Sequence, residues 1–347
     1  ATFTITYPLW HSHQILVAND WSFHASRVEE IYENLKSGHL FTYIATHTFQ
    51  KTGVANFLFY PTFFLYPWAL LRFAFSPVTA FYGWYALINF STLIITYFCA
   101  KRVSNSSIKA ILASLLYTFM PYHMFVGMGV FGEFIAMMFI PLVLLGGYEL
   151  FFTDDHQWKT LSVGLVLVSY SHILSTFLCI ELLVVLFVIS LFLKKWNNID
   201  RIKALLKSII LASLLVFTLV APLISDYIGQ NIVSTQSGIN FEMVSPVKVL
   251  IFNSFSGIYN QNLGIILIIT LLTGYICFNN RFLITVWLLG CVTALMTTGL
   301  FPWEKVQSII PVLGVIQFPY RYMSYAGLFL SLVAAEAIGS PILKLDE

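Results

Sequence analysis

The chain has 347 residues, of which 58% are hydrophobic and only 10% are charged. Soluble domains carry about 25% charged residues, because a water-facing surface needs a polar skin. The composition therefore excludes a water-soluble globular protein. It predicts an all-α, polytopic transmembrane helix bundle, since lipid is the solvent that tolerates apolar side chains on the outside. The net charge of +2 gives no reason to expect a nucleic-acid partner.

Residues 1–10 are apolar but too short to span a bilayer, which takes about 20 residues. We expect a first helix that is truncated here, and we read the short tail 344–347 in the same way. No sequence repeat or soluble domain is visible, so a single transmembrane domain over residues 1–347 is the simplest expectation.

An outer juxtamembrane loop is expected over residues 10–76. Within it, Asn19 to Ile31 has helical patterning, and Asp20, His24 and Arg27 follow the i, i+4, i+7 rule that places side chains on one face. Val28, Ile31 and Leu35 form a separate apolar stripe, which we expect to rest on the bilayer.

The face with Asp20, His24 and Arg27 has two interpretations. As a site, the carboxylate takes a proton from an acceptor hydroxyl while the imidazole and guanidinium hold a phosphate. As plain surface structure, Asp20 caps the helix and Arg27 pairs with Glu29 or Glu30.

The run 54–75 is long enough to span, but Pro61 and Pro67 interrupt its helical pattern and Arg72 lies near its end. We therefore expect juxtamembrane or re-entrant helices in the outer leaflet. About nine full spans are expected after it, at about 20 residues each. They are 77–100, 107–126, 130–152, 158–173, 174–194, 203–226, 262–278, 281–300 and 318–338, with a turn at Ser171-His172.

Basic residues set the orientation, because cytoplasmic loops are enriched in Lys and Arg. The loops 101–109, 153–159, 194–207 and 279–281 carry Lys101, Arg102, Lys159, Lys194, Lys195 and Arg281, and alternating spans place all four loops inside. Residues 10–76, 127–129, 171–172, 227–261 and 301–317 then lie outside.

Three polar residues stand at the outer ends of predicted spans: Glu133, His172 and Arg321. A charge at membrane depth is a functional hypothesis by default. The structural alternatives are an acid at a helix N-terminus for Glu133, a packing histidine for His172 and snorkelling to lipid phosphates for Arg321. Together with Asp20 and its neighbours they fall at one depth, which favours a shared site.

Metal and nucleotide chemistry have little support in the sequence. The four cysteines stand singly in apolar runs, and His11-x-His13 is a weak metal signal without a carboxylate cluster nearby. We expect no metal ligand set, and nothing in the sequence requires a divalent cation. No nucleotide-binding fingerprint is present, which favours a substrate that arrives dissolved in the membrane.

Short motifs in the same order resemble membrane glycosyltransferases of the GT-C type. They are Asn19-Asp20 with Phe23-His24-x-x-Arg27, Gly53 with Tyr60-Pro61, Met120-Pro121-Tyr122 with Gly132-Glu133 and Pro141-Leu142, Ser171-His172, and Pro319-Tyr320-Arg321. Thr62 replaces a proline of the family pattern. The pattern is most similar to bacterial members often labelled as related to 6-pyruvoyl-tetrahydropterin synthase.

This resemblance implies a function and a set of roles. Such enzymes move a sugar from a polyprenyl-phosphate carrier, usually with inversion, to an acceptor at the outer face of the bacterial cytoplasmic membrane. The acceptor is an envelope glycan, teichoic acid, lipid or protein. Asp20 is then the candidate catalytic base, and His24, Arg27, Tyr60, Glu133, His172 and Arg321 are candidate substrate-binding residues. Many members also carry a C-terminal outer domain that selects the acceptor, which this chain would lack.

Two other functions remain open. One is a transporter or flippase of a lipid-linked substrate, although the spans hold few polar residues near the midplane, where transporters bind. The other is a non-catalytic membrane subunit of envelope polymer assembly, because a fold alone does not fix a function.

Overall fold

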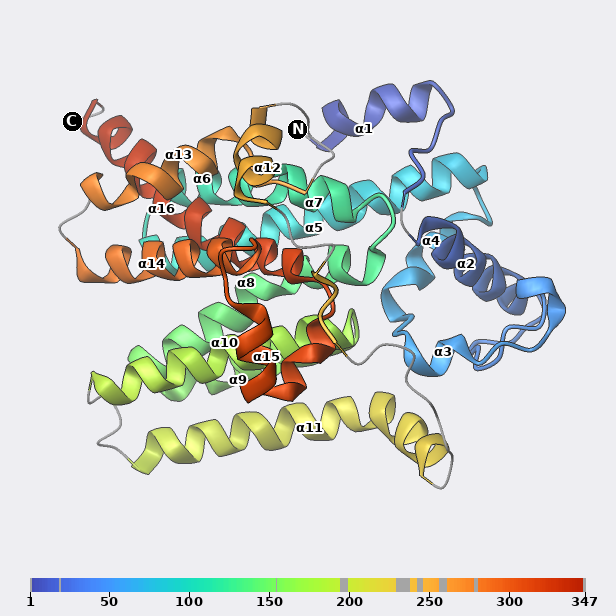
Figure 1. The fold of residues 1–347 in the computed structure, drawn as a ribbon. Coiled ribbons are helices and arrows are strands. Elements are labelled where there is room, and N and C mark those ends of the chain that lie inside the picture. The colour runs from blue at the N-terminus through green and yellow to red at the C-terminus, as the bar shows by residue number, and fades with distance from the viewer. Residues whose placement is uncertain are drawn as a thin grey trace. The chain divides into compact units, whose positions relative to one another are not determined.

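We describe the protein from a computed structural model of the chain. It describes all residues except 1, 19, 154, 194–198, 229–237, 242–245, 256–260, 278–279 and 346–347. Asn19, Lys194, Lys195 and much of the predicted 227–261 loop thus lie outside the described residues. Helices dominate the rest (Figure 1), and its β-pairing is one isolated bridge between Ala45 and Val54, so the all-α prediction is confirmed.

The helices of the first half begin with the loop helices and continue into the apolar ones. They are α1 (Thr2–His11), α2 (Trp21–Lys36), η1 (Phe49–Lys51), α3 (Asn56–Phe59), η2 (Phe63–Leu65), α4 (Tyr66–Leu71), α5 (Pro77–Ser104), α6 (Ser107–Thr118), α7 (Pro121–Val126), α8 (Phe131–Phe152), η3 (Asp155–Gln157) and α9 (Trp158–Ser169).

The second half continues the apolar series, with shorter helices between them. Its helices are α10 (Ile173–Phe192), α11 (Ile199–Tyr227), α12 (Val247–Phe252), η5 (Asn253–Phe255), α13 (Ile265–Thr273), η6 (Gly274–Cys277), α14 (Arg281–Met296), α15 (Trp303–Ile309), η7 (Pro311–Ile316), η8 (Pro319–Tyr322) and α16 (Met323–Leu345).

The described part of the chain has five helices long and apolar enough to cross a membrane: α5, α8, α10, α11 and the η8–α16 stretch. The apolar helices α6, α9 and α14 are shorter. The protein is thus a multi-pass membrane protein. Every predicted span coincides with a helix or a helix pair, and the turn expected at Ser171-His172 separates α9 from α10. The number of nine full spans stays a prediction.

The contacts divide the chain into two compact units, described separately here. Unit 1 comprises residues 1–92 and 126–232, and unit 2 comprises residues 93–125 and 233–347. The expectation of a single domain stays a prediction.

In unit 1, α8 and α9 pack closely because glycines line their contact. A Cβ added at Gly146 would lie 2.4 Å from the backbone nitrogen of Leu161, and one at Gly164 would lie 2.9 Å from that of Val143. Small residues allow such close approach between membrane helices, where packing drives association. α11 joins the other side of α9, where the Ser162 hydroxyl lies 3.0 Å from that of Ser208.

The segment 54–75 forms the short helices α3, η2 and α4, as the prediction of non-spanning helices requires. Pro61 lies between α3 and η2, whereas Pro67 is in the first turn of α4, where its missing N–H costs nothing. Pro67 therefore starts a helix and does not interrupt one. Its placement in the outer leaflet stays a prediction.

Helix α2 has the predicted pattern but a different environment on its apolar side. Val28 and Ile31 are buried within the protein, at 1% and 0% exposure. For Val28 and Ile31, the prediction that the stripe rests on the bilayer is therefore wrong. These side chains are buried because α4, which follows 30 residues later in the chain, packs against α2.

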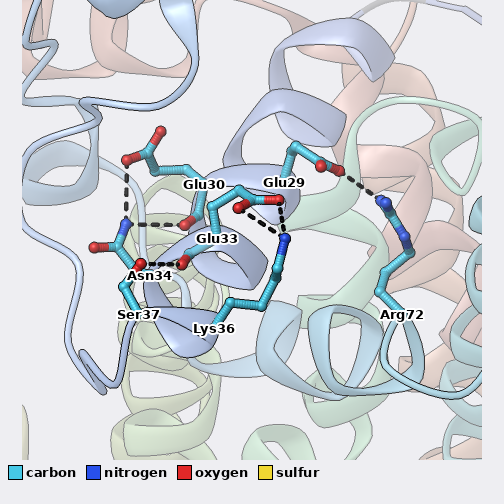
Figure 2. A network of polar contacts seen from close by, with 7 residues as sticks. All are labelled: Glu29, Glu30, Glu33, Asn34, Lys36, Ser37 and Arg72. Atoms are coloured by element: carbon cyan, nitrogen blue, oxygen red, sulfur yellow. Dashed lines mark hydrogen bonds and ion pairs between the residues drawn. The ribbon is translucent and has the colours of Figure 1, made fainter.

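The polar side of α2 carries a row of side-chain contacts (Figure 2). Glu29 pairs with Arg72 at 2.6 Å, and Glu33 pairs with Lys36 at 3.0 Å. Asn34 donates to the Glu30 side chain at 3.1 Å. Glu29 and Glu30 therefore interact with Arg72 and Asn34, and not with Arg27 as the surface interpretation expected.

In unit 2, small residues bring three helices together. Ala100 of α5, Ala110 and Ala113 of α6, and Ala335 of α16 form a buried cluster. Lys109 and Glu336 form an ion pair beside it at 2.6 Å, and both side chains are largely buried. Alanine contacts allow close helix packing, and the ion pair adds a directional link between α6 and α16.

Candidate functional site

A cluster of aromatic rings in unit 1 supports the region where the predicted site residues meet. Trp68 of α4 stacks on Trp84 of α5 with ring centroids 5.1 Å apart. Phe131, the first residue of α8, lies 5.6 Å from Trp68 and 5.2 Å from Trp84, and 5.4 Å from the ring of His24 on α2. Four helices are thus joined around Phe131, which the sequence analysis did not single out.

The segment before α2 is attached to the loop before α8 by its backbone. The Ala18 amide donates to the Met128 carbonyl at 3.3 Å. A Cβ added at Gly129 would lie only 1.9 Å from the Ala18 oxygen, so no other residue fits there without a shift. This contact places the start of α2, and with it Asp20, beside the start of α8.

Asp20 occupies the N-cap position of α2, but its side chain makes no capping hydrogen bond. Only its backbone is engaged, because its carbonyl accepts from the His24 amide at 3.0 Å. The carboxylate is exposed and forms no hydrogen bond or ion pair with the described residues. Asp20 is therefore a carboxylate available to a ligand.

His24 and Arg27 lie on the same α2 face as predicted, but both are buried and bonded to each other. The Arg27 Nη1 atom lies 3.0 Å from His24 Nδ1. Its Nη2 atom donates to the carbonyl oxygens of Tyr60 and Pro61 at 2.8 and 3.0 Å. The guanidinium carbon also lies 5.3 Å from the centre of the Tyr60 ring. Arg27 thus attaches the Tyr60-Pro61 segment to α2.

Burial changes the titration of both side chains. It lowers the pKa of Arg27 to about 9, while the neighbouring Tyr60 acts in the opposite direction, so Arg27 stays charged at neutral pH. Burial also lowers the pKa of His24 well below its usual value, and the charges of Arg27 and His172 lower it further. His24 is therefore neutral at physiological pH.

Glu133 and His172 lie at the starts of two helices of unit 1. Glu133 is in the first turn of α8 and is buried, and His172 is the N-cap residue of α10. A Cβ added at Gly132 would lie 2.8 Å from His172 Cδ2, so the imidazole lies directly against the α8 backbone. His172 Nδ1 lies 2.9 Å from the Ser175 hydroxyl, which fixes the ring. The N-termini of α8 and α10 thus meet.

Unit 1 therefore brings together six of the seven predicted site residues: Asp20, His24, Arg27, Tyr60, Glu133 and His172. Tyr60 is the most exposed aromatic of the set, at 43%. Arg321 belongs to unit 2 and is described with that unit.

In unit 2, Arg321 lies in η8 directly before α16, at the predicted start of the last span. Its side chain is buried, and Nη1 donates to the Ile316 carbonyl at 2.6 Å. The neighbouring Tyr320 ring lies 6.3 Å from that of Tyr122, so the Pro121-Tyr122 and Pro319-Tyr320-Arg321 motifs meet in this unit.

Glu30 has a role that the sequence analysis missed. Its buried carboxylate accepts hydrogen bonds from the amides of Thr46, His47 and Thr48 and from the Thr48 hydroxyl, at 2.8 to 3.1 Å. Burial alone would raise its pKa, but these hydrogen bonds outweigh it and hold the pKa below the usual value. A single carboxylate thus organises the loop 45–54. Its partners are 16 to 18 residues away, so helical periodicity gives no signal for it.

The described residues contain no group of three or more His, Cys, Asp or Glu side chains that could hold a metal ion.

Comparisons with known proteins give a limited result. No protein-family model matches the chain, and no curated protein matches it. A similar solved structure is ArnT from Cupriavidus metallidurans bound to undecaprenyl phosphate, at 11% sequence identity and a TM-score of 0.41. That match covers 99% of this chain and 78% of ArnT. These comparisons do not assign the chain to a family.

Proposed function

We propose that this protein is a membrane glycosyltransferase that moves a sugar from a polyprenyl-phosphate carrier to an acceptor of the cell envelope. The observation that carries the proposal is Asp20, an exposed carboxylate without a capping bond at the N-terminus of α2. It stands beside the joined starts of α8 and α10, within a multi-pass membrane protein.

In the proposed reaction, Asp20 is the general base. An acceptor hydroxyl transfers its proton to the Asp20 carboxylate as its oxygen attacks the anomeric carbon of the sugar. The bond between that carbon and the phosphate oxygen breaks, and the polyprenyl phosphate leaves with the electron pair. A carboxylate at hydrogen-bonding distance contributes typically about 10²–10⁴-fold to such a step.

The leaving phosphate is already anionic, so it needs stabilisation more than protonation. Backbone N–H groups and the dipole at a helix N-terminus favour an anion. The starts of α8 and α10, with His172 between them, supply such an environment in unit 1. We assign Arg321 as a further phosphate ligand on the basis of its motif, and Glu133 as the residue that orients the acceptor.

The carrier's hydrocarbon chain needs an apolar surface near this site. The segment after Tyr60 supplies one, because Phe63, Phe73 and Phe75 are exposed at 63%, 52% and 51%. Large exposed aromatics on a membrane protein are suited to contact lipid chains. We therefore place the polyprenyl chain along the 54–75 segment.

The experiment uses the purified full-length chain in detergent with a panel of radiolabelled polyprenyl-phosphate sugars and an envelope-fraction acceptor. Detergent removes any transmembrane gradient, so net transport cannot occur and sugar transfer alone moves label to the acceptor. We expect label on the acceptor with at least one donor. Movement of labelled lipid across proteoliposomes, without transfer from any donor in the panel, would instead support a transporter.

A further inference from the structure

The contact between His24 and Arg27 fixes which nitrogen of the imidazole carries its proton. A guanidinium has only N–H donors and no acceptor. Because Arg27 Nη1 lies 3.0 Å from His24 Nδ1, Nδ1 must be the unprotonated, accepting nitrogen. A neutral imidazole has one proton, so that proton is on Nε2.

The environment of His24 opposes any other protonation state. A proton on Nδ1 would face the Arg27 guanidinium, and an imidazolium would place two cations 3.0 Å apart in a buried position. The titratable neighbours are Arg27 on α2, Tyr60 of the attached segment and His172 at the start of α10. Arg27 and His172 are cationic when protonated, so they lower the pKa of His24 beyond the effect of burial.

The Nε2–H group has no partner within the described protein. His24 is only 5% exposed, and its hydrogen bonding to the described residues is confined to the Nδ1 contact with Arg27. Nε2–H is therefore the donor that the imidazole can offer to a ligand. The ring is also held from several sides by Phe23, Tyr60 and Phe131 at 5.1 to 6.1 Å. Its direction is therefore fixed.

We propose that His24 is a fixed, neutral hydrogen-bond donor that binds an oxygen of the polyprenyl-phosphate ligand through Nε2–H, and that Arg27 is the positioning residue that sets its tautomer. This inference rests on the proposed function for the identity of the ligand. It gives His24 and Arg27 different tasks, because only His24 contacts the ligand.

The tautomer is tested first, on the wild-type chain without any substrate. The full-length protein is labelled with ¹⁵N-histidine, and the His24 signal is assigned by its loss in His24→Gln. We expect a protonated Nε2 and an unprotonated Nδ1 that persist from neutral pH down through the ordinary histidine pKa of 6.5, a range in which an ordinary histidine becomes charged. A proton on Nδ1, or an imidazolium within this range, would overturn the proposal.

Ligand contact is tested with two variants that separate the two nitrogens. In His24→Asn the side-chain oxygen can take the place of Nδ1 as the acceptor for Arg27, but the Nε2 donor is lost. In His24→Gln the amide nitrogen reaches the place of Nε2 and retains the donor. Binding of undecaprenyl phosphate to each full-length protein is then measured in detergent.

We expect about tenfold weaker binding by His24→Asn, the loss of one hydrogen bond to a charged oxygen, and binding within about threefold of wild type by His24→Gln. Wild-type binding by His24→Asn would show that His24 serves only to accept from Arg27. Equal loss in both variants would show that a donor at the Nε2 position does not sustain binding, and either result would overturn the proposal. The binding result is independent of sugar transfer. Absence of transfer with this binding pattern intact would therefore count against the proposed function and not against the donor role of His24.

Discussion

At the residue scale, Asp20, His24 and Arg27 share one face of α2, and Arg27 joins that face to the Tyr60-Pro61 segment. The spacing of Asp20, His24 and Arg27 is a property of the helix, so it could be read from the chain. The partners of Arg27 are carbonyls 33 and 34 residues away, and no local pattern predicts them. For this reason Arg27, which was predicted to bind phosphate, is hydrogen-bonded to backbone carbonyls in the structure.

Arg27→Lys is expected to destabilise the protein by about 2–3 kcal/mol, because a lysine cannot reproduce the bidentate contact and leaves buried carbonyls without donors. Chemical denaturation of the detergent-solubilised protein gives the free energy of unfolding, and hydrogen exchange should be faster at the Tyr60 amide. Arg72→Lys is the matched control. Its ion pair with Glu29 is partly exposed, so it should cost no more than about 1 kcal/mol. Equal effects of the two variants would contradict this account.

At the element scale, helices and their breaks were predictable, whereas the surfaces that cover them were not. Pro61 marked the break after α3, and Ser171-His172 marked the end of α9. The apolar stripe of Val28 and Ile31 was visible too, but whether lipid or protein covers it depends on the tertiary contact with α4. The loop 45–54 depends in the same way on one distant carboxylate.

Glu30→Gln should loosen the loop 45–54 and reduce stability by about 2–3 kcal/mol, since hydrogen bonds to a charged acceptor are worth more than neutral ones. Three loop residues with left-handed backbone, Phe49, Gln50 and Lys51, have φ values of +50° to +59°. Such conformations cost about 1–2 kcal/mol per residue, and the Glu30 hydrogen bonds offset part of this cost.

The same carboxylate predicts a pH dependence. The pKa of Glu30 is lowered in the folded protein from the ordinary value of 4.5, so its stabilisation is complete above that value and declines as the pH falls through the folded-state pKa. Wild type should therefore lose stability relative to Glu30→Gln between about pH 4.5 and more acidic values. A constant difference between the two proteins across this range would argue against Glu30 as the anchor.

Gly132→Ala should displace His172, because the added Cβ would lie 2.8 Å from Cδ2 of a ring that Ser175 holds in place. Overpacking of this kind costs about 1–3 kcal/mol. Removing the ring in the double variant Gly132→Ala, His172→Ala should restore part of the lost stability, which a double-mutant cycle measures. Simple additivity of the two single changes would mean that the residues do not press on each other.

At the scale of the whole molecule, composition determined the class of protein and hydropathy located the helices. This succeeded because a bilayer imposes long apolar segments that are visible in one sequence. The division into two compact units was not visible, since each unit combines segments that are distant in the chain. A shared site of six residues was predicted from their common depth, and the resemblance added Tyr60. Of these seven residues, six lie in unit 1.

The predicted orientation can be tested with single cysteines in a cysteine-free background. His39 lies in the first loop and Lys159 lies in the first turn of α9, and both are exposed. A membrane-impermeant maleimide should label His39→Cys in intact cells and should reach Lys159→Cys only after permeabilisation. The reverse pattern would invert the topology and place the candidate site on the other face.

The most direct test of the central claim is the rate of sugar transfer by Asp20→Asn relative to wild type, with the polyprenyl-phosphate donor that wild type uses. Asp200→Asn is the matched control, because Asp200 is an exposed carboxylate on α11 paired with Lys203. We expect kcat to fall by about 10²–10⁴-fold in Asp20→Asn, with little change in donor binding, and to stay unchanged in Asp200→Asn. Transfer by Asp20→Asn at the wild-type rate would contradict the account, because Asp20 could not then be the base.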